Sequence, residues 1–356
     1  MREEALEIQK AVEQEIQRIL NGLFEDTPGE LKDVIVEFSH FVLRPGKRIR
    51  PFLLVLTYKG YSDNDAENNA LKLAAIIEIM HAFLLVHDDV IDESLLRRGE
   101  LTLHKIYESK FENEKLGKDL AIIVGDIISF YLLGVLSELN IESRTFRKVL
   151  RLFSDCYVKT GYGQLLDILY TGRLDETILT DDIPAKISLL KTAYYTFIHP
   201  MLFGYYLSGQ NDEKEIKTLT EIGKLVGIAF QYRDDIIGTF GGDKKSVNDI
   251  VEGKATILIK KTSEKLSSEK KMTLFDIISK KEKTQEEIEL IQSLILESGA
   301  LTETVNEINI LVLKALDLLE KLFMKDRSKE EIKRILNKIL EIPQIGEVRN
   351  GGEISG

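Results

Sequence analysis

The sequence predicts an all-α protein, and three observations favour that fold class. Apolar residues recur at helical spacing almost everywhere, from Leu6, Val12 and Ile16 near the start to Ile308 and Val312 near the end. No segment alternates convincingly with the period of two that is typical of a strand. The chain has only six prolines, and no hairpin dipeptide lies between β-branched runs. We therefore expect a helical bundle of about ten or more helices.

The order of the helices follows from apolar runs and from the breaks between them. The main apolar helical runs lie at 6–23, 73–86, 120–136, 222–230 and 308–319. Breaks in which Gly, Pro, Asp, Asn or Ser gather lie at 26–29, 61–64, 172–182, 208–212 and 238–246. Because none of these breaks is long enough for a domain linker, we expect a single domain over residues 1–345. We expect residues 346–356 to form a frayed tail.

Composition restricts the compartment and the partners. The 48 Lys and Arg residues against 59 Asp and Glu give a net charge of −11, so no global basic field favours nucleic acid. The single cysteine, Cys156, excludes an intrachain disulfide and fits a reducing cytoplasm. Residues 2–23 lack the apolar core of a signal peptide. The most lipid-like run, 120–136, carries Asp126 in its middle, so we expect a buried helix there and no transmembrane segment.

The strongest chemical signal is an acidic cluster that follows the run 73–86. Asp88 and Asp92 are four residues apart, so a helix stacks them on one face with Asp89 beside them. Without counter-charge, carboxylates at this spacing destabilise a helix and raise one another's pKa. Mg²⁺ prefers carboxylate oxygens, keeps several waters and is commonly shared with substrate phosphates. The cluster therefore predicts a metal site, with an exposed acidic helix end as the alternative.

A second acidic pair, Asp234 and Asp235, follows the apolar run 222–230, and Gly238 stands four residues after Asp234. If the two acidic helices face each other, their carboxylates bracket a cavity. The mouth of that cavity would hold a metal-bound diphosphate, and its apolar walls would hold a hydrocarbon. Such a site is suited to ionising a carbon–oxygen bond.

Several motifs in one order resemble the trans-prenyl diphosphate synthase family, from about residue 43 to residue 256. Gly46 to Pro51 resembles the family's GKRxRP segment, Asp88 to Asp92 its first DDxxD, and Arg97 to His104 its RRGxPTxH, with Leu101 where proline is usual. Gly125-Asp126, Gly163-Gln164 with Asp167, Lys191-Thr192, Phe230-Gln231 with Asp234-Asp235, and 249–254 follow in sequence. Gly238 departs from the pattern, since the second motif often has its third aspartate there. The resemblance implies one bundle around a central cavity.

The same resemblance implies roles for individual residues. Lys47, Arg50, His81 and Arg98 would hold the diphosphate of isopentenyl diphosphate. Arg97, Lys191 and Lys245 would hold the allylic diphosphate, with Lys254 as a further substrate-binding residue and Lys244 as the alternative to Lys245. Asp88, Asp89, Asp92 and Asp234 would bind metal, with Asp235 as a further candidate. Lys191, Thr192 and Gln231 would stabilise the reacting cation.

The mechanism that this implies begins with about three Mg²⁺ ions, which make the allylic diphosphate a leaving group. The double bond of isopentenyl diphosphate then attacks the allylic cation, and a proton is lost, with the departing diphosphate as the base. Positioning of the two substrates supplies much of the rate. The family usually forms homodimers, so we expect one here.

Other functions fit the residues less well. A terpene cyclase needs only one diphosphate site, and Lys47, Arg50 and the Arg97-Arg98 pair argue against it. A silent partner subunit would be expected to lack aspartates of the first motif. A helical di-iron protein needs two Glu-x-x-His pairs, and Glu78 with His81 forms the one pair on a suitable helix.

Product length should depend on side chains just before the first motif, where a bulky residue can stop the growing chain. Phe83 lies five residues before Asp88, about 7.5 Å along a helix, and a helical wheel places Leu84 closer to the aspartate face. The resemblance favours Phe83, because members with one aromatic there and a small neighbour such as Ala82 tend to make C20 products. We expect geranylgeranyl diphosphate, with C15 and C25 as alternatives and Met80 as a deeper stop.

Overall fold

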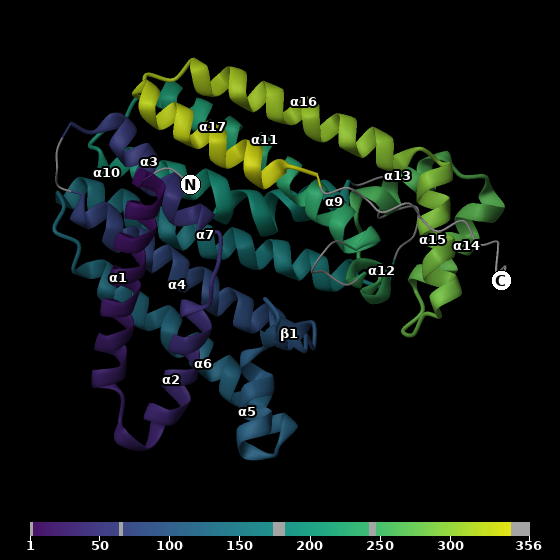
Figure 1. Cartoon of the computed structure of the whole chain (residues 1–356), viewed down its shortest axis with the longest axis horizontal. Helices are drawn as coiled ribbons and strands as arrows, with labels where there is room; N and C mark the ends of the chain where they lie inside the picture. The colour runs from purple at the N-terminus through teal and green to yellow at the C-terminus, as the bar shows by residue number, and fades with distance from the viewer. Residues whose placement is uncertain (1–2, 64–66, 174–181, 242–246, 343–356) are drawn as a thin grey trace, which may run out of the picture. The chain divides into compact units, whose positions relative to one another are not determined.

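The computed structural model describes residues 3–63, 67–173, 182–241 and 247–342 (Figure 1). Within these ranges the chain forms well over ten helices and only two strands, of two residues each, so the predicted all-α class is confirmed. The chain divides into two compact units. Unit 1 comprises residues 1–156, 195–220 and 322–332, and unit 2 comprises 157–194, 221–321 and 333–356. A single domain over 1–345 remains a prediction, and the tail at 346–356 lies outside the described residues.

The first half of the chain supplies most of unit 1. Its elements are α1 (Glu3–Asp26), the 3-10 helix η1 (Gly29–Leu31), α2 (Lys32–Leu43), α3 (Ile49–Tyr61), α4 (Asn68–Ile91), β1 (Leu96–Arg97), β2 (Glu100–Leu101), α5 (Leu103–Phe111), α6 (Glu114–Ser137) and the start of α7 (Ser143–Tyr170). The later helix α10 (His199–Leu207) also belongs to this unit.

The core of unit 1 is built on α3 and α4. Nearly every residue of α3 is buried, and α4 buries most of its length from Ala70 to Val86. In Figure 1, α4 lies beside α1 and α6. Gly204 of α10 allows a close approach to α3, because a Cβ there would lie 2.3 Å from the carbonyl oxygen of Leu54. The core therefore fixes α4, the helix that carries the first acidic cluster.

A small hairpin follows α4 and was not predicted from the sequence. β1 and β2 pair antiparallel, with Leu96 opposite Leu101 and Arg97 opposite Glu100. The two turn residues, Arg98 and Gly99, have φ of 58° and 83°, as a two-residue turn with positive φ at both positions requires. The sequence signal was weak because Arg-Gly is an unusual pair for this turn.

Unit 2 contains the later helices of the chain. They are α9 (Ile183–Ile187), η2 (Ser188–Ile198), α11 (Glu213–Phe240), α12 (Asn248–Glu252), α13 (Ile257–Lys265), α14 (Ser268–Ile278), α15 (Gln285–Glu297), α16 (Ala300–Glu320) and α17 (Asp326–Leu340). The helices α7, η2, α11 and α17 each contribute residues to both units.

Small residues bring three helices of unit 2 close together. A Cβ at Gly163 of α7 would lie 2.2 Å from the backbone nitrogen of Lys191, and one at Gly227 of α11 would lie 2.2 Å from the Cβ of Ala193. The helix between them, η2, is a π-helix, a form that is rare and frequent at functional sites. These contacts position Lys191 and Thr192.

The apolar run 120–136 forms a helix as predicted, but this helix is less buried than predicted. Two helices, α4 and α6, are long and apolar enough to cross a membrane by length and composition, but only 39% of the apolar window of α6 is buried, against 72% for α4. The outward side of α6 exposes Ile123, Ile127 and Phe130, the last at 74%. Exposed apolar patches of this kind are often interaction surfaces.

Candidate functional site

The first acidic cluster lies at the carboxyl end of α4. Asp88 and Asp92 are partly exposed, whereas Asp89 is buried. Arg97 of the hairpin reaches back to this cluster: its Nε donates to Asp89 Oδ1 at 2.8 Å, and its terminal nitrogen lies 3.5 Å from Asp88 Oδ2. The cluster thus combines two accessible carboxylates with a third that is held by a guanidinium.

Electrostatics distinguish these groups. Burial raises the pKa of Asp89 to about 6, although Arg97 acts in the opposite direction. Burial opposes the charged form of Arg97, yet Asp89 raises the pKa of this guanidinium overall. In the described part of the chain, Oδ2 of Asp89 is buried without a hydrogen-bond partner. A cation supplied with the substrate would satisfy that oxygen.

The donor set fits Mg²⁺, which prefers carboxylate oxygens. Among the described residues, no three acidic, histidine or cysteine side chains converge closely enough to hold an ion by themselves. Mg²⁺ usually retains waters and binds through one or two carboxylates together with substrate phosphates. The residues at the end of α4 therefore suit ions that arrive with a diphosphate.

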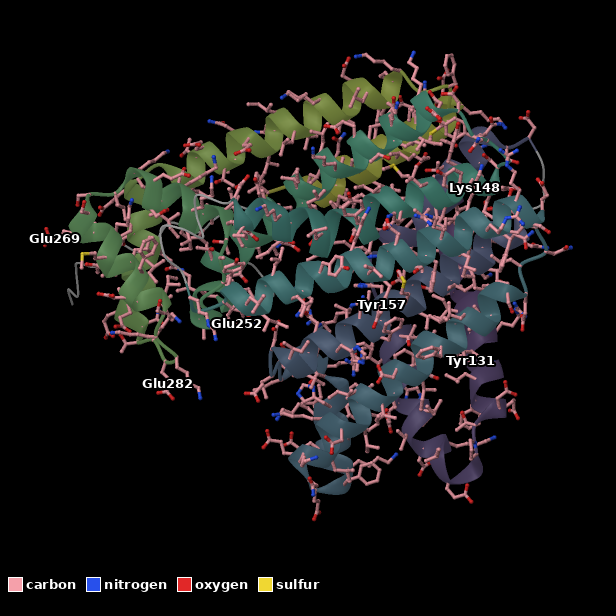
Figure 2. The ribbon with its side chains drawn as sticks, turned by 180° about the vertical axis from the view of Figure 1, so that it is seen from behind. Tyr131, Lys148, Tyr157, Glu252, Glu269 and Glu282 are labelled. Carbon is pink, nitrogen blue, oxygen red and sulfur yellow. The ribbon has the colours of Figure 1, made fainter. Side chains whose placement is uncertain are left out.

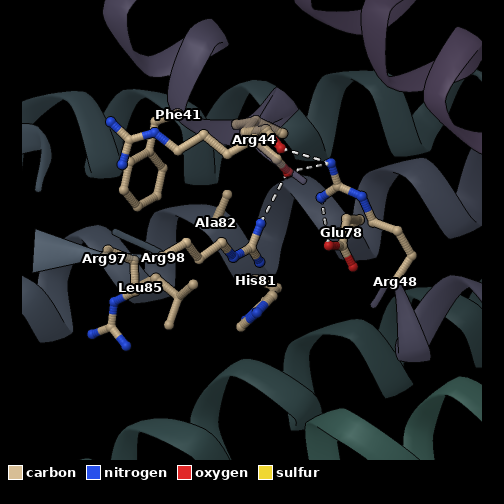
Figure 3. Close-up of a pocket in the computed structure, with 10 residues that line it drawn as sticks. Phe41, Arg44, Arg48, Glu78, His81, Ala82, Leu85, Arg97 and Arg98 are labelled. Carbon is tan, nitrogen blue, oxygen red and sulfur yellow. Dashed lines mark hydrogen bonds and ion pairs between the residues drawn. The ribbon is translucent and has the colours of Figure 1, made fainter. Parts of the chain in front are cut away.

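An arginine-rich pocket lies in unit 1, beside the same helix (Figure 3). It is lined by Phe41, Val42, Arg44, Arg48, Glu78, His81, Ala82, Leu85, Arg97 and Arg98. Figure 3 shows the guanidinium of Arg98 turned toward Arg44 and that of Arg97 turned away from it, so the hairpin sends its two arginines in different directions. Four arginines against one glutamate make this pocket suitable for an anion.

The predicted residues of the isopentenyl diphosphate site are all in unit 1. His81 and Arg98 line the pocket, whereas Arg50 and the exposed Lys47 are not among its lining residues. Arg50 is buried, donates to Thr196 Oγ1 at 2.7 Å and lies 4.1 Å from the centre of the Tyr195 ring. Burial, together with the nearby arginines, lowers the pKa of His81 well below its usual value. His81 is therefore a neutral hydrogen-bonding group at pH 7.

The sequence interpretation gave no site role to three charged residues that line the pocket, namely Arg44, Arg48 and Glu78. Arg44 donates to Leu101 O at 2.9 Å and pairs with Glu100 Oε2 at 3.1 Å. Glu78 accepts from Arg48 at 2.8 Å. A signal for Arg44 existed in its place just before the Gly46 motif, but an arginine at the end of a helix is also common at surfaces.

In unit 2, a chain of hydrogen bonds links the predicted cation-stabilising residues. Thr192 Oγ1 donates to Gln231 Oε1 at 2.6 Å, and Gln231 Nε2 donates to Asp235 Oδ1 at 2.9 Å. The other Asp235 oxygen accepts from the backbone nitrogen of Ile257, the first residue of α13, at 3.1 Å. Asp235 thus joins α11 to α13.

The two aspartates of the second motif differ. Burial, and then the charge of Asp249, raise the pKa of Asp235 to about 8. Asp234 keeps 29% of its side chain exposed and lies 3.3 Å from Arg233. We interpret Asp234 as the better metal ligand, since Asp235 already uses both oxygens within the protein.

The structure explains why glycine occupies position 238. A Cβ at this position would lie 2.1 Å from Oδ2 of Asp249, so the Asp249 carboxylate fills the space that a third aspartate of the motif would need. The short helix α12 carries Asp249, and Lys254 just after it pairs with Glu252 at 2.7 Å. Lys191 pairs with Asp167 at 2.6 Å. Lys244 and Lys245 lie outside the described residues.

The residues predicted to set chain length also differ in burial. Phe83 and Met80 are each 1% exposed, whereas Leu84 is partly exposed. The ring of Phe83 lies edge-on to His87, with 6.2 Å between ring centres. His87 contacts α6 at Gly125, where a Cβ would lie 2.2 Å from its Nε2. Phe83 is therefore buried in the core of unit 1.

The fold is all-α, carboxylates suited to Mg²⁺ lie at one helix end, an arginine pocket lies beside that helix, and a second acidic pair follows later in the chain. Together these features are typical of enzymes that act on prenyl diphosphates. The chain belongs to the polyprenyl synthetase family, whose model matches residues 32–295. It is a trans-prenyl diphosphate synthase.

Three comparisons give the range of its relatives. The chain is 34% identical to a geranylgeranyl diphosphate synthase of Saccharolobus solfataricus, over 72% of this chain and 74% of the relative. It is 29% identical to a geranylfarnesyl diphosphate synthase of Aeropyrum pernix, over 85% and 92%. Its structure resembles a geranylgeranyl pyrophosphate synthase of Corynebacterium glutamicum in complex with isoprenyl diphosphate and magnesium, with a TM-score of 0.85, 25% identity and coverage of 94% and 98%.

Proposed function

We propose that this enzyme condenses an allylic diphosphate with isopentenyl diphosphate in a Mg²⁺-dependent reaction and forms the C20 product, geranylgeranyl diphosphate. The observation that carries the proposal is the pairing, on one helix of unit 1, of an acidic cluster with an arginine pocket. Two diphosphates with different counter-charges need two such sites. A terpene cyclase would need only the first.

The acidic cluster and the pocket have separate tasks in this proposal. Asp88, Asp89 and Asp92 would bind the metal ions of the allylic diphosphate, with Asp234 as a further ligand. Mg²⁺, when bound, neutralises this diphosphate and improves it as a leaving group. Arg97 lies close to Asp89, orients it and would also hold the allylic diphosphate. Asp235 keeps its structural bonds to Gln231 and Ile257.

The second diphosphate would lie in the arginine pocket. Arg98 offers a planar set of donors to phosphate oxygens, and neutral His81 donates one hydrogen bond. Lys47 and Arg50 would complete the site from the start of α3. Fixed in this way, the double bond of isopentenyl diphosphate is oriented for attack, and orientation supplies much of the rate.

The bonding changes balance without an oxidant or a reductant. The allylic carbon–oxygen bond breaks, and the diphosphate takes both electrons. The double-bond electrons of isopentenyl diphosphate form the new carbon–carbon bond, which leaves a positive charge on the other carbon of that double bond. A carbon next to this charge then loses a proton to the released diphosphate, and a new double bond forms. The backbone carbonyl of Lys191, the Thr192 hydroxyl and the Gln231 amide would stabilise the cation by their dipoles. The charged side chains of Lys191, Lys245 and Lys254 would bind phosphate.

We also propose that the enzyme is a cytoplasmic homodimer that uses the exposed face of α6. Figure 2 shows this helix with Tyr131 labelled. Ile123, Ile127 and Phe130 recur on its outward side at intervals of four and three residues. A second copy of the chain is the occupant that would bury this self-complementary strip. The single cysteine fits a reducing compartment.

One incubation tests the reaction. Purified protein is mixed with Mg²⁺, isopentenyl diphosphate and a C5, C10 or C15 allylic diphosphate, and the dephosphorylated products are separated by chain length. We expect a C20 alcohol as the main product and no product with EDTA. Consumption of the allylic diphosphate alone to a cyclic hydrocarbon would instead identify a cyclase, and no reaction would identify a silent subunit.

Product length has its own test in Phe83→Ala. If the buried ring of Phe83 stops the growing chain, its removal should shift the main product to C25 or longer, with Met80 as the next stop. Because truncating a buried Phe costs about 3–5 kcal/mol, the assay is run at low temperature and folding is checked by circular dichroism. An unchanged C20 product would exclude Phe83 as the stop, and Leu84→Ala would be the next variant.

A further inference from the structure

We propose that Arg48 and Glu78 form a buried latch that positions Arg98 in the arginine pocket and thereby sets the affinity for the second diphosphate. Neither residue was assigned a role above, and we assign them as positioning residues that act through Arg98. The inference rests on the proposed function, because it concerns the site that would bind isopentenyl diphosphate.

The latch begins with the position of Arg48 at the start of α3. Its backbone adopts φ 47°, a left-handed conformation that costs free energy for a residue other than glycine. Three hydrogen bonds donated by the guanidinium offset this cost: to Glu78 Oε1 at 2.8 Å, to Val42 O at 2.9 Å and to Arg44 O at 3.1 Å. Both charged side chains are only 3% exposed. Arg48 therefore ties the last turn of α2 and the following loop to α4.

Arg98 is held by the same loop. Its Nη1 donates to Arg44 O at 3.1 Å and to Pro45 O at 3.2 Å. The Arg44 carbonyl oxygen thus accepts from both Arg48 and Arg98, as the dashed lines in Figure 3 show. A shift of this carbonyl moves the anchor of Arg98, so the position of Arg98 depends on the latch.

Gly46 provides independent support for this coupling. A Cβ at Gly46 would lie 2.8 Å from Nη1 and 3.0 Å from Cζ of Arg98. The guanidinium therefore lies directly against the backbone of the loop, with no room for a side chain between them. The absence of a side chain at Gly46 is a requirement of the Arg98 position.

A second set of bonds joins the loop to the hairpin that carries Arg98. The Arg44 side chain donates to Leu101 O at 2.9 Å and pairs with Glu100, both on β2. The loop and the hairpin are thus connected in both directions, by the Arg44 side chain and by the Arg44 carbonyl. The latch fixes one end of this assembly to α4 through Glu78.

Charge explains why an anchor is needed. Burial, and then the charges of Arg48, Arg50 and Arg97, lower the pKa of Arg98, while Glu78 acts in the opposite direction. The repulsion between these like charges opposes the position of Arg98 in the pocket. Glu78 is the one acidic group among the described residues lining the pocket, and its bond to Arg48 makes a neutral pair. Arg44 and Arg97 are paired with Glu100 and Asp89, whereas Arg98 bonds to backbone carbonyl oxygens and can bind an anion.

The decisive variant is Arg48→Met/Glu78→Gln, which removes both charges together. Removing one partner alone would leave an unpaired buried charge and endanger folding, whereas replacing both is often tolerated. The double variant should fold, as judged by circular dichroism and by its Tm, but it loses the bonds to Val42 O and Arg44 O. We expect the Kd for isopentenyl diphosphate, measured by calorimetry with Mg²⁺ and no allylic substrate, to rise by about tenfold or more. The KM for the allylic diphosphate should change by less than about threefold.

Gly46→Ala tests the same link without touching the ion pair, because its methyl group displaces the Arg98 guanidinium. It should weaken isopentenyl diphosphate binding in the same way and leave the allylic KM unchanged. Tyr61→Phe is the matched control, since it removes the bond from Tyr61 to the buried Glu215 within the same unit. We expect the control to lower the Tm without changing either substrate constant.

The outcomes separate this inference from the proposed function. If the wild-type protein does not form prenyl diphosphates, the proposed function fails first. If it does form them, a folded double variant with wild-type affinity for isopentenyl diphosphate would overturn the latch. Equal losses for both substrates, or a loss in Tyr61→Phe as large as in Gly46→Ala, would also overturn it, because a general loss of stability would then explain the effect.

Discussion

At the residue scale, the three carboxylates at the end of α4 have different surroundings. Asp88 is partly exposed, and Asp89 is buried against Arg97. Removal of the Asp88 carboxylate should therefore affect chemistry alone. Removal of the Asp89 carboxylate should also leave Arg97 without its main partner.

The first prediction compares these two positions. Asp88→Ala should lower kcat by about 10²-fold or more, since a ligand for the metal-bound leaving group is lost, and should leave the Tm near that of the wild type. Asp89→Ala should lose activity and about 1–3 kcal/mol of unfolding free energy. Product assays and urea unfolding measure both effects. Full activity in the two variants would contradict the metal-site proposal.

A second prediction concerns pH and the buried His104. Only 1% of His104 is exposed, and burial lowers its pKa below the usual 6.5. The unfolded chain therefore binds a proton at a higher pH than the folded chain does. The stabilising effect of the neutral imidazole is complete above about pH 6.5 and decreases as the pH falls toward the folded-state pKa.

The buried carboxylates Asp89 and Asp235 have the opposite effect on the pH dependence of stability. Their raised pKa values favour proton uptake by the folded chain as the pH falls. The measurement is accordingly a difference between the wild type and His104→Gln in urea unfolding. The wild type should lose more free energy of unfolding than the variant between pH 7.5 and about pH 5.5. Parallel pH profiles for the two proteins would show that His104 does not titrate in this range.

At the element scale, close approaches between helices position the candidate site. Gly163 and Gly227 bring α7 and α11 against η2, and Gly238 brings α11 against the Asp249 side chain. A larger residue at such a position must displace backbone or a neighbouring carboxylate. At Gly238, the Asp249 carboxylate therefore occupies the space that a side chain would need.

The third prediction restores the aspartate that the family often has at this position. Gly238→Asp should lower the free energy of unfolding by about 1–3 kcal/mol, because the new Cβ would overlap the Asp249 carboxylate. It should also reduce activity. Gly29→Asp is the control, since nothing lies within 4 Å of a Cβ there, and its stability should stay within about 0.5 kcal/mol of the wild type. An active, equally stable Gly238→Asp enzyme would refute this explanation.

At the scale of the whole molecule, the uncovered apolar face of α6 is the surface that we propose for association between copies of the chain. Its exposed residues include Phe130, which is 74% exposed, and Ile123, which is 56% exposed. Large apolar side chains that recur on one face of a helix favour association, because water is released when they are buried.

Phe130→Asp should therefore convert the proposed homodimer to a monomer, because a charge at the centre of an apolar interface is left unpaired. Light scattering coupled to gel filtration measures the mass in solution. Leu313→Asp on α16, at a residue that is 67% exposed, is the control and should leave the mass unchanged. A wild-type protein that is monomeric at micromolar concentration would refute the dimer.

What the sequence by itself determined was the all-α class, the family motifs and the residue types of both acidic clusters. Helical periodicity and short motifs are local properties, so they can be recognised without coordinates. The position of Asp88 and Asp92 on one helix face is of this kind, since a spacing of four residues fixes a shared face, whereas the metal site itself stays a prediction.

Only the tertiary structure decided which of these charged groups are partners. The sequence places Arg97 and Arg98 side by side, yet the hairpin turn directs one to Asp89 and the other to the Arg44 carbonyl. It also pairs Arg48 with Glu78, thirty residues apart, and sets Asp249 against Gly238. Burial and long-range hydrogen bonding depend on how helices that are distant in the chain pack together, and no local pattern contains that information.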